Sequence, residues 1–384
     1  MKVFFVPLCI LLKHINNTSM EISFNRKSFI AAFGIGSMMA GKSKLAPALN
    51  NAKIVVKQKE CVVSSYDGET AIRKRFDIIH SDEDVKFCVN PKDLMNILRS
   101  IKDDVVTFDI SGLILRIRHQ KGELSIPIES ADDFPQPQVE KGGSEFILDS
   151  EVLLAMINEG KLFRGNDEIR PVLSGIQLYI GKGVFGVYAS DQRFLYNYEE
   201  IHECNDDIVS VILPPGSIEP ILNIVNSTET VRVVIQERNA QVISEDSAIV
   251  LRILEGRYPN AKSIIPTISN VEAVVDKEEL YESVKRASLT SSSVSNIIKM
   301  SVEGMSMNIM SEDIDLSKKG VENIMCKSNG NITIGVNYNN VMNAISVLGE
   351  EIHINFIDPS RAMVWKDSEH ERKLVLIMPM VLQE

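Results

Sequence analysis

The stretch Met20-Glu-Ile-Ser-Phe-Asn-Arg-Lys-Ser-Phe-Ile-Ala-Ala-Phe33 decides the fold, because its pattern occurs three times in the chain. It alternates like a short strand, places Asn25 where a helix cap belongs, and continues with apolar residues at helical spacing. The same pattern returns at Phe146–Ile157 and Ala273–Val284. The caps Asn25, Asp149 and Asp276 are 124 and 127 residues apart, so the sequence predicts an internal repeat.

Two further markers keep this period. A second strand-helix unit occurs once in each repeat, and its equivalent residues Val89, Leu213 and Val336 are 124 and 123 apart. Alternating strands separated by turns follow each second helix. The closing segments Asp133-Phe-Pro135 and Arg257-Tyr-Pro259 are 124 apart, and Leu374–Met380 closes the third repeat. Three markers in one order argue against chance similarity of common strand-helix units.

The repeat predicts the α+β class, with three tandem domains that each contain two helices and several antiparallel strands. We expect domains at residues 20–143, 144–267 and 268–384, preceded by an appendage of 1–19 without fixed structure. The chain has 384 residues, 44% of them hydrophobic and 24% charged, which is too long for one typical domain.

The N-terminal stretch Lys2–Leu12 imitates a short secretory signal, although no clear A-x-A cleavage site follows. We favour Met20 as the natural first residue, with secretion as the alternative. No run approaches the roughly 18 apolar residues of a membrane-spanning helix. The five cysteines include no C-x-x-C pair, which suits a reducing compartment. These features predict a soluble, cytoplasmic protein that does not bind membranes.

The net charge of −11 argues against a protein that holds nucleic acid by bulk attraction. Any contact with DNA is therefore expected to be local or topological.

A literal phosphate-loop motif, G-x-x-x-x-G-K-[ST], spans Gly36 to Ser43. Such a loop lies between a buried strand and a helix, whereas Asn25–Phe33 reads as a helix and Pro47 leaves little room for another. A loop that presents Lys42 and Lys44 to DNA phosphates is the alternative, while an NTPase using Lys42 and Ser43 stays a rival hypothesis.

No other motif indicates catalysis. The six histidines are scattered without metal-ligand spacing, and no G-x-S-x-G occurs. We therefore predict neither an enzyme nor a metal or other cofactor.

Four local segments carry a resemblance to the bacterial sliding clamp, the beta subunit of DNA polymerase III. They are Arg170–Ile176, Ser190–Leu195, Leu254–Pro259, which fits L-[DE]-G-[RK]-[FY]-P, and Met378–Leu382, which is similar to M-P-M-R-L. The similarity covers about residues 20 to 382 and keeps the register of the repeats.

The resemblance implies a head-to-tail homodimer, in which six domains form a ring around duplex DNA without reading its sequence. It implies a processivity factor whose partners are the replicative DNA polymerase, the clamp loader, a 3'-5' exonuclease complex and other proteins carrying clamp-binding peptides. A clamp-like protein that has lost the ring and only binds partners is a further alternative.

The resemblance also implies site residues. The peptide groove between the second and third domains comprises Leu173, Ser190, Arg193, Leu195, Pro266, Leu376, Met378, Pro379, Met380 and Leu382. The expected dimer contacts are Leu124, Ile126 and Leu289. The expected DNA contacts are Lys42, Lys44, Arg99, Lys161, Arg164 and Arg170.

The chain departs from the family pattern in its working surfaces. Gln192, Arg193 and Phe194 replace Gly-His-Arg, and Val381 replaces the terminal Arg. The second helix of the middle domain begins at Pro214-Pro-Gly-Ser217 without the basic pair expected there. Peptide preference and the strength of DNA contact are therefore expected to differ.

Overall fold

A computed structural model describes residues 20–42, 46–166, 169–204 and 206–382. The chain divides into two compact units, one of residues up to 138 with 246–249, and one of residues 139–245 with 250–384. The leader, the motif residue Ser43 and the expected DNA contact Lys44 lie outside the described residues.

The described part of the first unit contains two helices and two groups of antiparallel strands. One sheet has the order β5-β1-β7-β8-β9, and the strands of the other group have the order β4-β3-β2-β6. The bounds are β1 Met20–Asn25, α1 Arg26–Gly36, the 3-10 turn η1 Pro47–Asn50, β2 Ala52–Lys57, β3 Glu60–Tyr66, β4 Thr70–Asp77, β5 His80–Ser81, β6 Val85–Val89, α2 Pro91–Ser100, β7 Val105–Ser111, β8 Ile114–His119 and β9 Gly122–Pro127.

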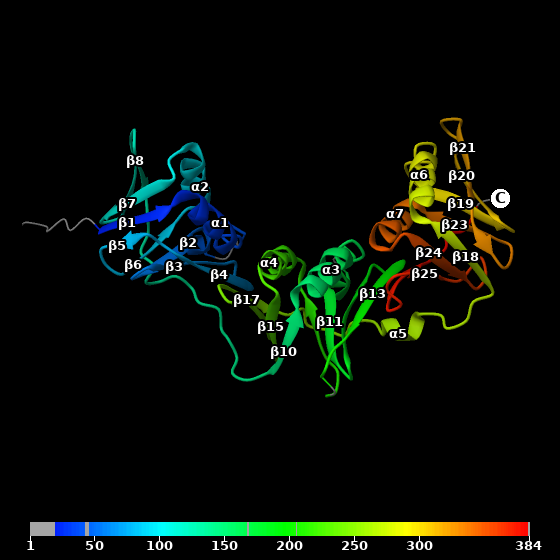
Figure 1. Cartoon of the computed structure of the whole chain (residues 1–384), viewed down its shortest axis with the longest axis horizontal. Coiled ribbons are helices and arrows are strands. Elements are labelled where there is room, and N and C mark those ends of the chain that lie inside the picture. The colour runs from blue at the N-terminus through cyan, green and yellow to red at the C-terminus, as the bar shows by residue number, and fades with distance from the viewer. Residues whose placement is uncertain (1–19, 43–45, 167–168, 205, 383–384) are drawn as a thin grey trace, which may run out of the picture. The chain divides into compact units, whose positions relative to one another are not determined.

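The second unit contains the other two repeats (Figure 1). The elements of the second repeat are β10 Ser144–Asp149, α3 Ser150–Gly160, the 3-10 turn η2 Pro171–Ser174, β11 Ile176–Gly181, β12 Val184–Ser190, β13 Phe194–Ile201, β14 Val209–Leu213, α4 Pro215–Val225, β15 Thr230–Ile235, β16 Asn239–Ile243 and β17 Ser247–Arg252, which crosses the division between the units. After α5 Ala261–Ile264 come β18 Val271–Asp276, α6 Lys277–Ser288, β19 Ile297–Glu303, β20 Ser306–Asp313, β21 Lys318–Met325, β22 Lys327–Ser328, β23 Ile332–Asn337, α7 Tyr338–Val347, β24 Glu351–Phe356, β25 Met363–Asp367 and β26 Lys373–Ile377.

The three predicted caps start the first helix of each repeat. The side chain of Asn25 accepts a hydrogen bond from the Ser28 amide at 3.1 Å, and Asp149 and Asp276 each do the same three residues ahead, at 3.0 and 2.9 Å. A cap oxygen satisfies an amide that the helix leaves without a carbonyl, which fixes where each helix begins.

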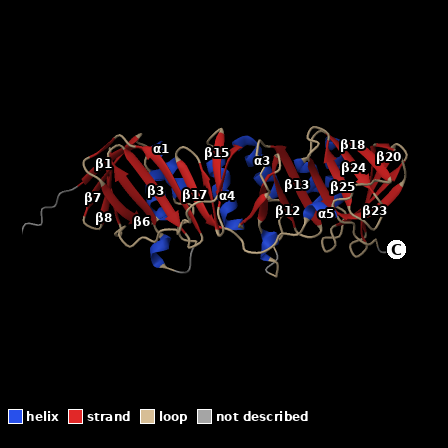
Figure 2. Cartoon of the chain, turned by 90° about the horizontal axis from the view of Figure 1, so that it is seen from below, coloured by secondary structure: helices blue, strands red, loops and turns tan. Residues whose placement is uncertain are grey.

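Each repeat buries the apolar face of its first helix on its sheets. In the first unit, Phe29 of α1 stacks on Phe24 at 4.2 Å between ring centroids and meets Phe108 edge-on at 5.3 Å. In the second unit, α3, α4, α6 and α7 cover one side of the strands, and α5 lies on the other (Figures 1 and 2). The predicted fold class, three copies of a two-helix antiparallel domain, is confirmed; the residue boundaries of the domains stay a prediction.

Candidate functional site: the groove beside the β13–β26 junction

The second and third repeats share one nine-stranded sheet, because β26 pairs antiparallel with β13. Leu195 lies opposite Leu376, and Tyr198 opposite Lys373. The main-chain hydrogen bonds of the ladder fix the register of this junction, and the side chains beside it therefore come from two repeats in a defined order.

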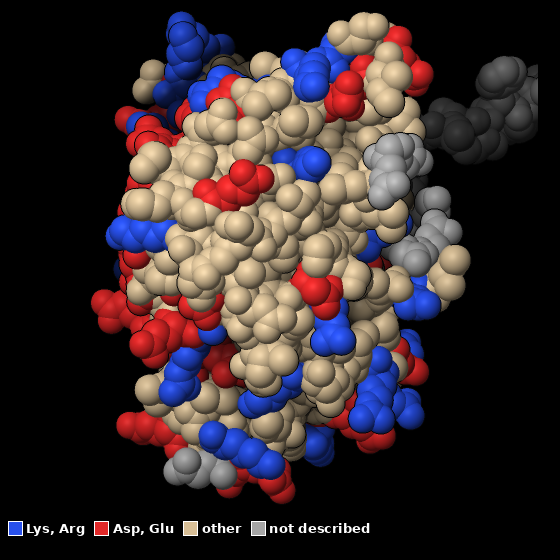
Figure 3. Space-filling model, turned by 90° about the vertical axis from the view of Figure 1, so that its right-hand side faces the viewer, with Lys and Arg blue, Asp and Glu red and all other residues tan. Residues whose placement is uncertain are grey.

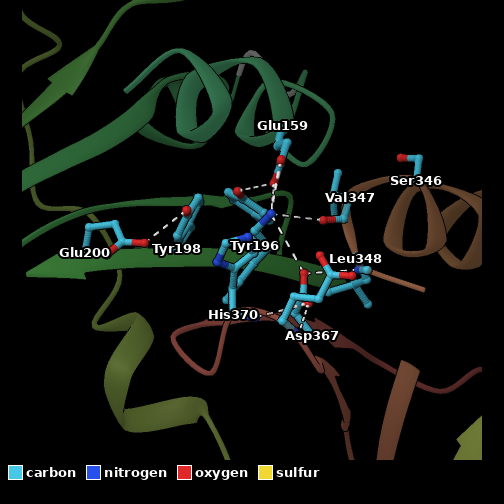
Figure 4. Close-up of polar contacts among 12 residues, drawn as sticks. Glu159, Tyr196, Tyr198, Glu200, Ser346, Val347, Leu348, Asp367 and His370 are labelled. Carbon is cyan, nitrogen blue, oxygen red and sulfur yellow. Dashed lines mark hydrogen bonds and ion pairs between the residues drawn. The ribbon is translucent and has the colours of Figure 1, made fainter. Parts of the chain in front are cut away.

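A buried ion-pair network locks the junction on the helix side (Figure 4). Lys373 Nζ lies 3.2 Å from the Glu159 carboxylate and donates to the Val347 carbonyl oxygen at 3.2 Å. Asp367 Oδ2 is 3.9 Å away, and the Tyr196 hydroxyl donates to Glu159 at 2.6 Å. The network joins α3 and β13 to the end of α7 and to β25, so it resists movement between the two repeats.

An apolar cluster lies on the opposite side of the sheet. The predicted groove residues Leu173, Leu195 and Leu376 are buried in it together. Six residues that the sequence reasoning did not select belong to the same cluster: Tyr179, Tyr188, Ile212, Tyr258, Ala261 and Ala362. The alternation along each strand could have shown which of the strand residues share a face of the sheet. Only the tertiary structure shows that the segment around Tyr258 packs on that face.

A cavity of about 320 Å³ opens where β13 begins and β26 ends. Four predicted residues line it, namely Arg193, Met378, Pro379 and Met380. The other lining residues are Asp191, Asn337, Asn340 and Val381. The two asparagines come from the start of α7, so the polar half of the cavity is made by a helix terminus that the sequence motifs do not mark.

Hydrogen bonds fix the loop between β12 and β13. The hydroxyl of the predicted residue Ser190 donates to the Phe194 carbonyl oxygen at 2.8 Å. The Met378 amide donates to the Arg193 carbonyl oxygen at 2.7 Å. Gln192 has a φ of 83°, a left-handed conformation that glycine adopts without strain, which gives a physical reason for the glycine expected at this position.

Burial raises the pKa of the Asp191 carboxyl, although amide hydrogen bonds from Arg193 and Phe194 oppose this shift. The two bonds are 2.7 and 3.0 Å long. Asp191 therefore shapes the loop and places a carboxylate at the cavity wall.

The remaining two predicted groove residues lie differently. Leu382 packs on Gly335 of β23, where a β-carbon would come within 2.7 Å of the leucine Cδ2. Pro266 is half-buried but belongs neither to the apolar cluster nor to the lining of the described cavity. The structure thus brings seven of the ten predicted residues into the cluster or the cavity and fixes Ser190 in the adjoining loop. Leu382 packs on β23, and Pro266 belongs to neither group.

The candidate DNA contacts are divided between the units. Lys42 and Arg99 are exposed in the first unit, while Lys44 lies outside the described residues. Lys161 pairs with Glu219 at 3.1 Å, and Arg164 donates to the Ser174 carbonyl oxygen at 3.3 Å. Arg170 donates to the Gln192 side chain, which places it at the groove loop.

The helices of the second unit carry more acidic than basic side chains. The carboxylates on α3, α4, α6 and α7 are Glu151, Glu159, Glu219, Glu278, Glu279 and Glu282, and the basic residues are Lys277, Lys285 and Arg286. Tight phosphate binding needs an excess of Lys and Arg, which this helix layer does not have.

The segment that matches the phosphate loop has the wrong context for nucleotide binding. Helix α1 ends at Gly36, and the next described elements after the motif are a 3-10 turn and β2. Gly36 is buried against Val63, where a β-carbon would approach within 2.7 Å. The first glycine of the motif therefore serves helix packing.

Two of the three expected dimer contacts lie on a strand at the edge of its sheet, and the third follows a helix. Leu124 and Ile126 lie on β9, at an edge of the five-stranded sheet, and Leu124 is 40% exposed. Leu289 follows α6 and is 74% exposed. Among the described residues, no group of His, Cys, Asp and Glu is arranged to hold a metal ion, and no helix has the length and apolar character needed to cross a membrane.

Comparison with known proteins identifies three matching family models. They are the N-terminal domain of the DNA polymerase III beta subunit at residues 20–138, its central domain at 147–260 and its C-terminal domain at 262–381.

Individual proteins match over nearly the whole chain. The beta sliding clamp of Streptococcus pneumoniae is 22% identical, with 89% of this chain and 93% of the relative covered. That of Bacillus subtilis is 23% identical, with 87% and 92% covered. The crystal structure of the Thermotoga maritima DNA polymerase III beta subunit superposes with a TM-score of 0.88 at 22% identity, covering 95% of this chain and all of that one.

Proposed function

Because the chain belongs to the family of the DNA polymerase III beta subunit, the beta sliding clamps, we propose that it works as a homodimeric ring around duplex DNA. The ring tethers the replicative polymerase, and it needs no active site for this task. The observation that carries the proposal is the strand pairing between repeats, since it leaves two matching edges for a second copy.

Strand β26 closes the third repeat and adds to β13 of the second. By the internal repeat, β9 is the counterpart of β26, and β21 is the counterpart of β13. Both β9 and β21 lie at edges of their sheets among the described residues. In a head-to-tail dimer, β9 of each protomer pairs with β21 of the other, which makes two equivalent joints. Such contacts between unlike ends form a closed ring when the rotation that relates the protomers closes on itself.

Two bridges align β9 with β26 residue by residue. Cys88 pairs with Glu129, and Gly335 pairs with Met380; Cys88 and Gly335 directly precede the repeat markers Val89 and Val336. Five residues before Glu129 and Met380 stand Leu124 and Val375, so these two are counterparts.

Val375 is fully buried at the β13–β26 junction, whereas its counterpart Leu124 is 40% exposed. Burying that exposed surface at a dimer joint contributes on the order of 1–2 kcal/mol per protomer at about 25 cal/mol per Å² of apolar area.

The partner side of the joint follows from the same repeat. Val375 lies opposite Tyr196, and the hairpins that begin at Val184 and Ser306 make Gly320 the counterpart of Tyr196. A β-carbon on Gly320 would meet the Thr290 side chain at 2.2 Å. Leu124 is therefore expected opposite a bare glycine, close to the segment that carries the exposed Leu289.

The surface of the third repeat suits such a joint. Figure 3 shows the face at the right-hand side of Figure 1, where the third repeat lies, and a broad central area of this face carries few charged side chains. The exposed apolar residues of this repeat include Leu289, Met305, Ile314, Leu316, Val321 and Met325. Exposed apolar surface of this extent is typical of a protein contact.

The groove beside β26 is proposed to bind short peptides of the polymerase, the clamp loader and other clamp partners. Leu173, Leu195 and Leu376 provide its apolar floor, and Met378 and Met380 line the adjoining cavity. Flexible thioethers adapt to different side chains, which suits a site that serves several partners.

DNA binding is proposed to be topological. The acidic helices of the second unit and the net charge of −11 give little attraction for phosphates, whereas a closed ring stays on DNA without tight contact. A separate ATP-driven loader opens and closes it in the cytoplasm.

Retention on DNA tests this function. After loading, the protein should stay on closed circular DNA at moderate salt and leave once the circle is cut. Direct phosphate binding would instead fall steeply with salt on circle and line alike, and equal loss from both would refute the ring. A monomeric mass by light scattering would favour the alternative of a clamp-like protein that only binds partners.

A further inference from the structure

A second cavity, of about 630 Å³, lies on the apolar-cluster side of the second repeat. It is formed by β11, β12, β14 and the segment 253–262, and we name it the tyrosine cavity. None of the groove residues predicted from the sequence lines it. Its walls, its charges and its connection to the groove each indicate a binding surface.

Two tyrosines form a rigid wall. The rings of Tyr179 and Tyr188 stack with centroids 4.8 Å apart and planes 18° from parallel. The Tyr179 hydroxyl donates to Glu199 at 2.7 Å and accepts from the Asn197 amide group at 2.9 Å. Gly186 leaves the space that this hydroxyl fills, since a β-carbon there would come within 2.6 Å. Fixed aromatic rings bind apolar side chains at low entropic cost.

The rim of the cavity is basic. Arg257 and Lys262 line it, and neither makes an ion pair within the described part of the chain. Lys182 is 3.7 Å from Asp207, whose side chain is fully exposed. The one carboxylate in the lining, Glu199, is engaged by Tyr179. The unpaired charges therefore favour a ligand with carboxylates.

Tyr258 connects the tyrosine cavity to the groove. It lines the cavity, and it packs in the same buried cluster as Leu173, Leu195 and Leu376. Its hydroxyl is buried and has no hydrogen-bond partner among the described residues. Tyr258 thus packs against the leucines assigned to the groove and also lines the tyrosine cavity.

We propose that the tyrosine cavity is a second subsite for the partner polypeptide, which takes an aromatic side chain flanked by carboxylates. The identity of that polypeptide as a clamp partner rests on the proposed function. The chemistry of the subsite rests on the stacked tyrosines and the unpaired rim cations alone. When one partner polypeptide fills both the groove and the subsite, its second contact forms within the same complex, and this raises its overall affinity.

Fluorescence anisotropy with two labelled peptides tests the subsite on the whole protein. The probes are fluorescein-Asp-Glu-Phe-Asp-Glu and fluorescein-Lys-Lys-Phe-Lys-Lys. We expect the acidic peptide to bind, and the double substitution Arg257→Glu with Lys262→Glu to weaken it about fivefold while improving binding of the basic peptide. Tyr188→Leu should weaken the acidic peptide without changing the preference for its charge.

A matched control changes the net charge equally at exposed residues outside the cavity, by Arg238→Glu with Lys366→Glu. The control should stay within twofold of the unchanged protein. The proposed subsite would be refuted if the control variant lost as much affinity for the acidic peptide, or if the acidic peptide did not bind at all. Displacement of the acidic peptide by a single-stranded oligothymidine would also refute it, because the site would then bind nucleic acid. DNA retention by the Arg257 and Lys262 variant, measured separately, shows whether the ring function stands when the subsite fails.

Discussion

The substitution Lys373→Met removes the cation from the network that joins the second and third repeats. The Lys373 side chain is only 7% exposed, and its partners Glu159 and Asp367 are 21% and 2% exposed. Methionine keeps most of the apolar length of the side chain, so the change isolates the charge. What it leaves behind is a pair of poorly solvated carboxylates.

Removing one partner of a buried ion pair costs about 3–5 kcal/mol, because the other charge stays buried without compensation. We expect a cost near the lower end of this range, because both carboxylates keep other hydrogen bonds. Asp367 still accepts the Gly349, Glu369 and His370 amides, and Glu159 keeps the Tyr196 hydroxyl. We therefore expect a loss of about 3 kcal/mol, which lowers the urea midpoint by about 1 M at a slope of about 3 kcal/mol per M.

Trp365 is the reporter. It is the only tryptophan of the chain, it is fully buried, and it lies opposite Val375 in the β25–β26 ladder. Urea unfolding followed by its emission reads the stability of this junction. Lys366→Met, an exposed lysine on the adjacent position of β25, is the matched control and should change the midpoint little.

Adding Glu159→Gln to Lys373→Met should recover part of the loss, because a neutral pair no longer leaves that charge unpaired. A midpoint shift below about 0.3 M for Lys373→Met, or one no larger than that of Lys366→Met, would show that water screens the network and would refute the reasoning.

Three further predictions concern the joint, the groove and pH. Leu124→Asp should convert the dimer to a monomer by placing a charge where its counterpart is fully buried, and an unchanged mass in sedimentation would contradict the β9–β21 pairing. Gly335→Ala should weaken peptide binding severalfold with little change in overall stability, because a β-carbon would come within 2.7 Å of the Met380 carbonyl oxygen and of Leu382; peptide titration and thermal unfolding measure the two effects. Burial raises the pKa of Asp191 above its unfolded value, so the folded state holds the proton more tightly and Asp191 lowers stability as the pH rises through this range. Asp191→Asn keeps an acceptor for the loop amides and should remove this loss, which urea midpoints compared between acid and neutral pH would detect.

The sequence by itself determined the repeated parts of the fold. The caps Asn25, Asp149 and Asp276 act within three residues of their own position, and strand alternation is equally local, so spacing along the chain was sufficient to predict them. Leu195 and Leu376 were named from the family resemblance, and the fold packs them into one buried cluster; their role in a peptide groove stays a prediction.

The tertiary structure decided which segments meet. The pairing of β13 with β26 joins residues about 180 positions apart, and it brings the cap region of α7 to the groove, where no local pattern marked Asn337 or Asn340. It also turned Arg170 toward Gln192, and it placed the first glycine of the phosphate-loop motif inside a helix contact. The sequence shows which side chains carry a charge or belong to a motif, but it does not show which groups they contact. For Arg170 and Gly36 the contact is set by the tertiary structure, and the contact determines what the residue does.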